Sequence, residues 1–218
     1  MTHCDPYPSY SRPERVADGV MHILGVAFAL IGTTALLIWA AGRSHPGTVL
    51  ALSVYGTAMV GSFLASACYH MTPWERVRPL LRRIDHAAIY FKIAGTYTPL
   101  VVLIGSAFGY AVLGLVWGLA AIGAVTKLFF WSRPGRWASA LYLLMGWIAV
   151  VLIWPLAPLL PLGAVVLIVL GGLIYSAGVL VFNHEGLRFQ NAIWHGFVLT
   201  ASTCFFAAIS LGTLATPA

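Results

Sequence analysis

The sequence predicts an all-α polytopic membrane protein, a seven-transmembrane-helix bundle with a cytoplasmic N-terminus and a C-terminus outside. Three observations predict this fold: an apolar composition, seven apolar stretches, and basic residues that gather in alternate gaps between them. Of the 218 residues, 60% are hydrophobic and only 8% are charged, whereas soluble domains carry about 25% charged residues. A chain with so few charges needs an apolar solvent, and a bilayer supplies one.

Each apolar stretch is long enough to cross a hydrocarbon core of about 30 Å, which needs roughly 20 residues in a helix. We expect helices because unpaired backbone groups are costly in lipid, and we expect no interrupted helix among them. The predicted spans are 20–41, 48–69, 84–104, 108–130, 137–155, 159–182 and 191–213. They form a transmembrane domain (20–213) between a polar cytoplasmic segment (1–19), which does not resemble a cleavable signal peptide, and a short C-terminal tail (214–218).

Arginine and lysine lie almost entirely on one side of these spans. That side holds Arg12, Arg15, Arg76, Arg78, Arg82, Arg83, Lys127, Arg133, Arg136 and Arg188. The other side has only Arg43, and Lys92 lies inside a span. The positive-inside rule then places the N-terminus in the cytoplasm of a multi-pass protein of the plasma (inner) membrane.

The net charge of +6 is therefore expected to reflect membrane orientation, and no nucleic-acid partner is predicted. The expected partners are membrane lipids. No motif predicts a protein partner or an oligomeric state.

Polar residues within the predicted spans are candidates for function, because they are costly in lipid. Ser66 and His70 lie four residues apart at the end of the second span, and Asn191 and His195 have the same spacing at the start of the seventh. Asp85 opens the third span. The predicted topology brings all five to the cytoplasmic end. Two imidazoles with nearby oxygen ligands suit Zn²⁺, and a catalytic zinc keeps one position for water.

Structural roles for the same residues stay open at this point. Each histidine could be an interface residue that bonds head groups, and Ser66 could be a small packing residue. Asp85 could pair with Lys92 or with the arginines before it. His22 opens the first span and could approach the cluster from another helix.

The chain resembles the hemolysin III family, the bacterial branch of the progestin and adipoQ receptor (PAQR) superfamily. The segments that carry the resemblance are ERVADGVMHILG (14–25), SACYH (66–70), RRIDHAAIYFKIAGTYTPL (82–100), GGLIYSAG (171–178) and NAIWHGFVL (191–199). They are spread over nearly the whole chain. The resemblance implies seven spans with a cytoplasmic N-terminus and a zinc site at the cytoplasmic side.

The family pattern is Ser-x₃-His, Asp and His-x₃-His on the second, third and seventh spans. Ser66 and His70 match the first element, Asp85 matches the second, and His195 matches the last histidine. Asn191 occupies the place of the first histidine of the final pair, and an amide oxygen is a weak zinc ligand. The missing ligand could be supplied by Asn191 itself, Asp85, His22 or His184.

The resemblance implies a zinc-dependent hydrolase of a lipid amide. Its metal ligands would be His70, His195 and Asn191, with Asp85 as the general base or the residue that orients water, and Ser66 in support. The alternative is a non-enzymatic sensor or regulator of the membrane, or a protein associated with cytolysis, as the family name suggests. A transporter is a third alternative, disfavoured by the lack of interrupted helices.

Overall fold

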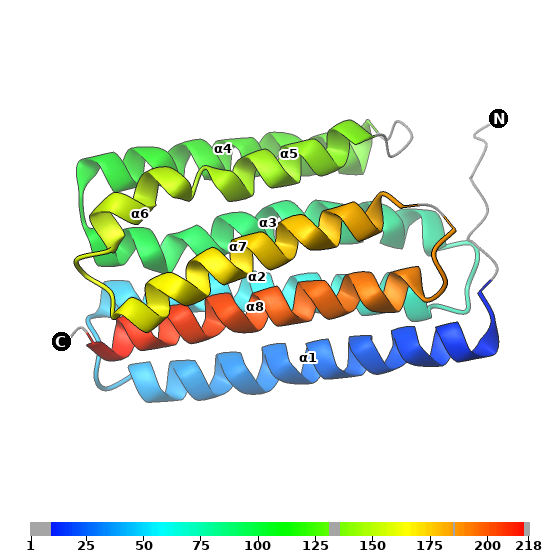
Figure 1. The fold of residues 1–218 in the computed structure, drawn as a ribbon, viewed down its shortest axis with the longest axis horizontal. Coiled ribbons are helices and arrows are strands. Elements are labelled where there is room, and N and C mark those ends of the chain that lie inside the picture. The colour runs from blue at the N-terminus through cyan, green and yellow to red at the C-terminus, as the bar shows by residue number, and fades with distance from the viewer. Residues whose placement is uncertain (1–9, 131–135, 185, 216–218) are drawn as a thin grey trace.

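The computed structural model describes residues 10–130, 136–184 and 186–215, and the side chains of 136–139 are not described. The predictions for Arg133, for most of segment 1–19 and for the last residues of the tail fall outside these ranges. The described residues form helices and no strand (Figure 1). The helices are α1 (Arg12–Ala40), α2 (Pro46–Met71), α3 (Arg78–Ile104), α4 (Ala107–Phe129), α5 (Arg136–Trp147), α6 (Val150–Leu156), α7 (Leu162–Phe182) and α8 (Gln190–Ala215).

Six of these helices are long and apolar enough to cross a membrane: α1, α2, α3, α4, α7 and α8. They correspond to six of the seven predicted spans. The remaining predicted span, 137–155, is not confirmed as a membrane-length helix, because this stretch forms the two shorter helices α5 and α6. In Figure 1 the two helices follow one another along the length of the bundle.

A side chain from another helix accounts for the break between α5 and α6. The Tyr97 hydroxyl donates a hydrogen bond of 2.6 Å to the carbonyl oxygen of Met145 and lies 3.1 Å from that of Gly146. The Ala149 amide bonds Gly146 instead of Met145, so the regular helical ladder stops there. No half-helix break stands out in the sequence here, whereas the structure has a turn at residues 148–149.

Helix α1 begins earlier than the predicted span because its first turn is well capped. Ser11 and Glu14 form a capping box in which the Ser11 amide bonds the Glu14 carboxylate at 3.0 Å, and a proline occupies the first turn. With 29 residues, α1 is about 43 Å long. It is thus longer than a hydrocarbon core of about 30 Å.

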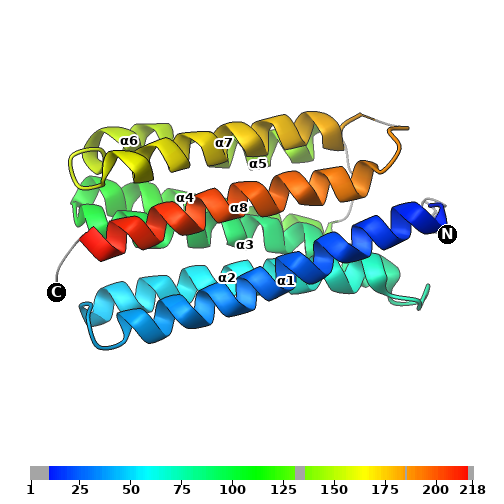
Figure 2. The ribbon, with the colours of Figure 1, turned by 60° about the horizontal axis from the view of Figure 1, so that its bottom comes forward.

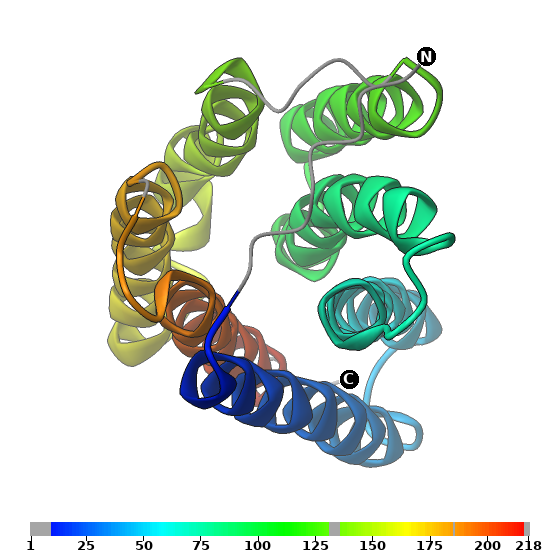
Figure 3. The ribbon, with the colours of Figure 1, turned by 90° about the vertical axis from the view of Figure 1, so that its right-hand side faces the viewer.

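The helices run along a common axis and form a ring when seen end on (Figures 2 and 3). The start of α1, the end of α2 and the starts of α3 and α8 lie at one end of the bundle, and α8 ends at the other (Figure 1). Helix α3 is the most buried of the six membrane-length helices, with half of its apolar window buried. A Cβ atom added at Gly95 would lie 2.7 Å from the Ala58 Cβ, so glycine there permits close packing of α3 against α2.

The outer surface of the bundle is apolar. Among its most exposed side chains are Ile23, Trp154 and Leu162, which are 71%, 88% and 79% exposed. Soluble proteins rarely expose contiguous apolar surface on this scale. Together with six membrane-length helices, this surface indicates an integral, multi-pass membrane protein.

Candidate metal centre

Three histidines from three helices meet at one end of the bundle. His22 on α1, His70 on α2 and His195 on α8 each offer one ring nitrogen, and these nitrogens lie within 4.8 Å of one another. The His22 and His195 rings are closest, with centroids 4.2 Å apart. We call these residues the histidine cluster.

Asp18, one turn before His22 on α1, lies against all three imidazoles. Its Oδ1 atom is 2.8 Å from His195 Nδ1 and 3.5 Å from His22 Nε2, and its Oδ2 atom is 3.6 Å from His70 Nδ1. The residue is only 5% exposed. A buried carboxylate that bonds an imidazole fixes the orientation of the ring and increases the basicity of its other nitrogen.

The contact with Asp18 also determines which nitrogen of His195 carries the proton. A carboxylate accepts hydrogen bonds only, so Nδ1 must donate, and a neutral ring then has a lone pair on Nε2. That Nε2 lies 3.3 Å from the Ser66 hydroxyl on α2. His195 is therefore prepared to bind a proton donor or a metal ion through Nε2.

The chemistry of His22 fits a metal site. Its Nε2 atom is buried without a hydrogen-bond partner among the described residues, and Asp18 Oδ1 lies 3.5 Å from it. Unsatisfied buried polar atoms are rare in folded proteins and often mark an ion. Three neutral imidazoles with one open position make a ligand set typical of catalytic zinc, although ligands at 2.0–2.1 Å from one ion would require the nitrogens to approach to about 3.4 Å.

The structure brings most of the predicted site residues together. His70, His195 and Ser66 lie in contact with the cluster or within it, and the Asn191 amide nitrogen lies 3.3 Å from His70 Nδ1. Asp85 is buried and lines the same cavity, but it forms no ion pair with the histidines.

Of the substitutes considered for the missing histidine, His22 lies in the cluster. His184 is exposed on the connection between α7 and α8.

Sequence reasoning missed Asp18, although a signal was present. Asp18 and His22 lie four residues apart, the same spacing as Ser66 with His70 and Asn191 with His195. This spacing places two side chains on one helix face. Three such polar pairs, on α1, α2 and α8, build the centre.

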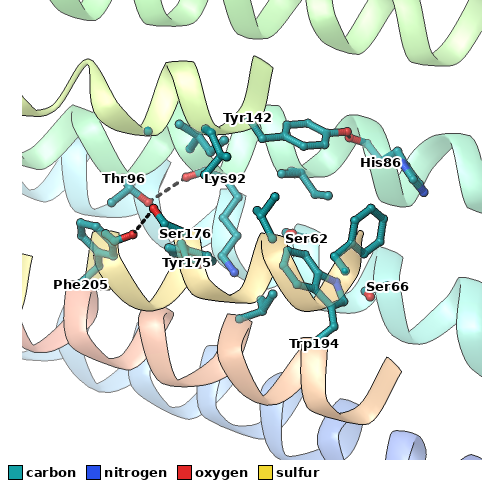
Figure 4. A pocket seen from close by; sticks show the side chains of 18 of the residues that line it. Ser62, Ser66, His86, Lys92, Thr96, Tyr142, Tyr175, Ser176, Trp194 and Phe205 are labelled. Carbon is teal, nitrogen blue, oxygen red and sulfur yellow. Dashed lines mark hydrogen bonds between the residues drawn. The ribbon is translucent and has the colours of Figure 1, made fainter. Parts of the chain in front are cut away.

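A cavity of about 960 Å³ inside the bundle is lined by His70 and His195 of the cluster. Figure 4 shows other side chains that line it, among them Ser66 and Lys92. Arg78, Arg82 and Tyr10 line its polar end, and side chains such as Leu156 and Ile168 line its apolar part. Tyr10 precedes α1, and burial, followed by the charge of Asp18, raises the pKa of its phenol.

Comparisons with known proteins agree with this architecture. The sequence model of the family described as "Haemolysin-III related" matches residues 10–206. The chain is 33% identical over 197 residues to "Hemolysin-3 homolog" of Bacillus subtilis (strain 168), covering 90% of this chain and 92% of that protein. It is 35% identical over 204 residues to "Hemolysin-3" of Bacillus cereus, covering 93% of each. It is 28% identical over 166 residues to human "Monocyte to macrophage differentiation factor", covering 72% of this chain and 67% of that protein.

Proposed function

Since the chain belongs to the haemolysin III family, we propose that it is a zinc-dependent membrane hydrolase that acts on a lipid amide. The observation that carries this proposal is the histidine cluster around Asp18 at the polar end of a long, mostly apolar cavity. His22, His70 and His195 would hold the ion, and Asn191 would bond His70 instead of binding the metal. A bound zinc would lower the pKa of a coordinated water towards neutrality and polarise a substrate carbonyl.

The protein residues would do the rest of the chemistry. Asp18 keeps His195 in the tautomer that presents Nε2. Asp85 is the carboxylate among the described residues that line the cavity, so it is the candidate to accept a proton from water. The Ser66 hydroxyl, 3.3 Å from His195, would donate to the oxygen on which negative charge develops.

The membrane setting completes the proposal. We propose seven spans, with α5 and α6 together as the fifth, because residues 136–156 in helical geometry would extend about 31 Å. The excess of basic residues supports a cytoplasmic N-terminus and therefore a centre at the cytoplasmic side of the inner membrane. A lipid would place its chain in the apolar part of the cavity and its amide at the cluster.

One experiment tests the metal and the reaction together. The protein is purified in detergent, and zinc per chain is measured by mass spectrometry for wild type, His70→Ala, His195→Ala and the exposed control His184→Ala. We expect about one zinc in wild type and control, and its loss in the two cluster variants. Release of a radiolabelled acyl chain from a lipid amide should follow the zinc content. A zinc-free wild type, or release unaffected by His195→Ala, contradicts the proposal.

The names of the two Bacillus relatives, "Hemolysin-3 homolog" and "Hemolysin-3", favour a second candidate function. In that case the chain is a non-enzymatic membrane protein associated with cytolysis or with the regulation of the bilayer state. Stoichiometric zinc without any hydrolysis of amide or ester lipids would support this second candidate.

A further inference from the structure

Lys92 is a buried cation inside the cavity. It lies near the middle of α3, its side chain is only 8% exposed, and it lines the cavity (Figure 4). The ion pairs of the described residues do not include Lys92, and its Nζ atom forms no hydrogen bond with them. A charged residue within a span is costly, so it marks a ligand site by default.

Aromatic rings flank the ammonium group. Nζ lies 4.3 Å from the centroid of Phe63 on α2 and 5.6 Å from that of Tyr175 on α7. Cation–π attraction offsets part of the cost of burying the charge. The rings accept no conventional hydrogen bonds, so the three N–H donors of the ammonium lack an acceptor from the protein.

Both flanking rings are held in place. A Cβ atom at Gly25 would lie 2.6 Å from the Phe63 ring, so α1 packs directly against this ring and fixes it. The Tyr175 hydroxyl is 2.8 Å from the Ser202 hydroxyl on α8. The position of the ammonium is therefore preorganised by four helices, α1, α2, α7 and α8.

Lys92 lies deeper along α3 than Asp85, which is near the end of the bundle that holds the histidine cluster. Lys92 follows Asp85 by seven residues on α3, which is about 10 Å along the helix axis. Apolar side chains, among them Leu100 and Leu156, line the cavity beyond it. The volume of the cavity, about 960 Å³, lies at the upper end of the range for small-molecule sites, about 300–1,000 Å³.

We propose that Lys92 is an anion-binding residue, which holds the acidic group of a single-chain amphiphile whose hydrocarbon chain fills the apolar part of the cavity. A carboxylate and a phosphate monoester share the chemistry that Lys92 recognises, because each offers charged oxygens to its N–H donors. The proposal requires no metal in the histidine cluster, so it does not depend on the proposed hydrolase activity.

Equilibrium binding to the full chain, purified in non-ionic detergent, tests this proposal with three radiolabelled probes of equal chain length. Laurate and dodecyl phosphate are anionic, and dodecanol is neutral. We expect wild type to bind at least one anion about tenfold or more tightly than dodecanol, as a charge-assisted hydrogen bond predicts. The two anionic probes distinguish a carboxylate ligand from a phosphate ligand.

Substitutions test whether Lys92 causes the preference for the anionic probes. Lys92→Met should abolish the preference for the anion and leave dodecanol binding unchanged, and Lys92→Arg should retain the preference. Lys127→Met is the matched control, since Lys127 is also 8% exposed in a membrane-length helix but does not line the cavity. Full anion preference in Lys92→Met, or an equal loss for dodecanol, overturns the proposal.

A metal ion in the histidine cluster could also bind an anion. The same assay distinguishes that possibility from binding by Lys92. The measurements are repeated with a chelator present and in His195→Ala. The preference should persist in both cases if Lys92 holds the anion. If the preference disappears with the metal while Lys92 is intact, the proposal is wrong.

Discussion

Asp18 Oδ1 lies 2.8 Å from His195 Nδ1, although 177 residues separate them in the chain. This contact joins α1 to α8 and determines which nitrogen of His195 can bind a metal. We therefore expect Asp18→Asn to weaken zinc binding about 10- to 100-fold, the usual cost of changing a carboxylate that supports a ligand. Competition with a chromogenic zinc chelator measures the change.

Glu14→Gln is a suitable control for this variant, because Glu14 is a neighbouring carboxylate of α1 that bonds Ser11 and the Phe189 amide rather than a histidine. Zinc affinity should be the same in this control as in wild type. If Asp18→Asn binds zinc as tightly as wild type, Asp18 has no role in the centre.

A second prediction distinguishes the two candidates for the third ligand. Zinc content should fall strongly in His22→Ala, because His22 lies in the cluster with a buried, unsatisfied nitrogen. Asn191→Ala should keep about one zinc per chain, because its amide nitrogen faces His70 and an amide is a weak zinc ligand. The opposite result would make Asn191 a ligand and exclude His22.

The break between α5 and α6 should depend on Tyr97. Tyr97→Phe leaves the Met145 carbonyl without its hydrogen bond in an apolar environment, which costs about 1–3 kcal/mol. We expect a lower midpoint of thermal unfolding in detergent. Tyr110→Phe, at a position that is 49% exposed, should leave the midpoint unchanged.

Close packing of α3 against α4 should depend on Gly123. A Cβ atom there would lie 2.5 Å from the buried Tyr90 ring, and overpacking of this kind costs about 1–3 kcal/mol. Gly123→Ala should therefore unfold at a lower temperature than wild type. Gly118→Ala on the same helix has no neighbour within 4 Å and should unfold at the wild-type temperature or above.

The proposed topology can be tested with reporters that are active on one side of the membrane only. Alkaline phosphatase fused after Ala218 should be active, because seven spans place the C-terminus outside. Green fluorescent protein fused at the same position should be dark. The reverse pattern would mean that α5 and α6 together do not cross the membrane.

Hydropathy was sufficient to predict the six membrane-length helices, because the length of an apolar stretch is a local property of the chain. The depth of Ser66, His70 and His195 followed from the same reasoning. The sequence did not predict which helices are neighbours, since periodicity does not reveal that α1 lies beside α8. Asp18 was missed for this reason.

The break in the fifth stretch was missed for a related reason. Its hydropathy is continuous across residues 148–149, and the hydroxyl that bonds the carbonyls there belongs to α3. The cost of interrupting a helix is thus offset by a residue that is distant in sequence. Local patterns contain no information about such a partner.

The distribution of the histidine cluster over α1, α2 and α8 has a consequence for biogenesis. Spans enter the bilayer in order as the ribosome synthesises the chain, so the first two histidines wait in the membrane until the final helix delivers His195. A truncated nascent chain therefore lacks the third imidazole of the cluster, so a metal bound as proposed would report that translation has reached the last helix.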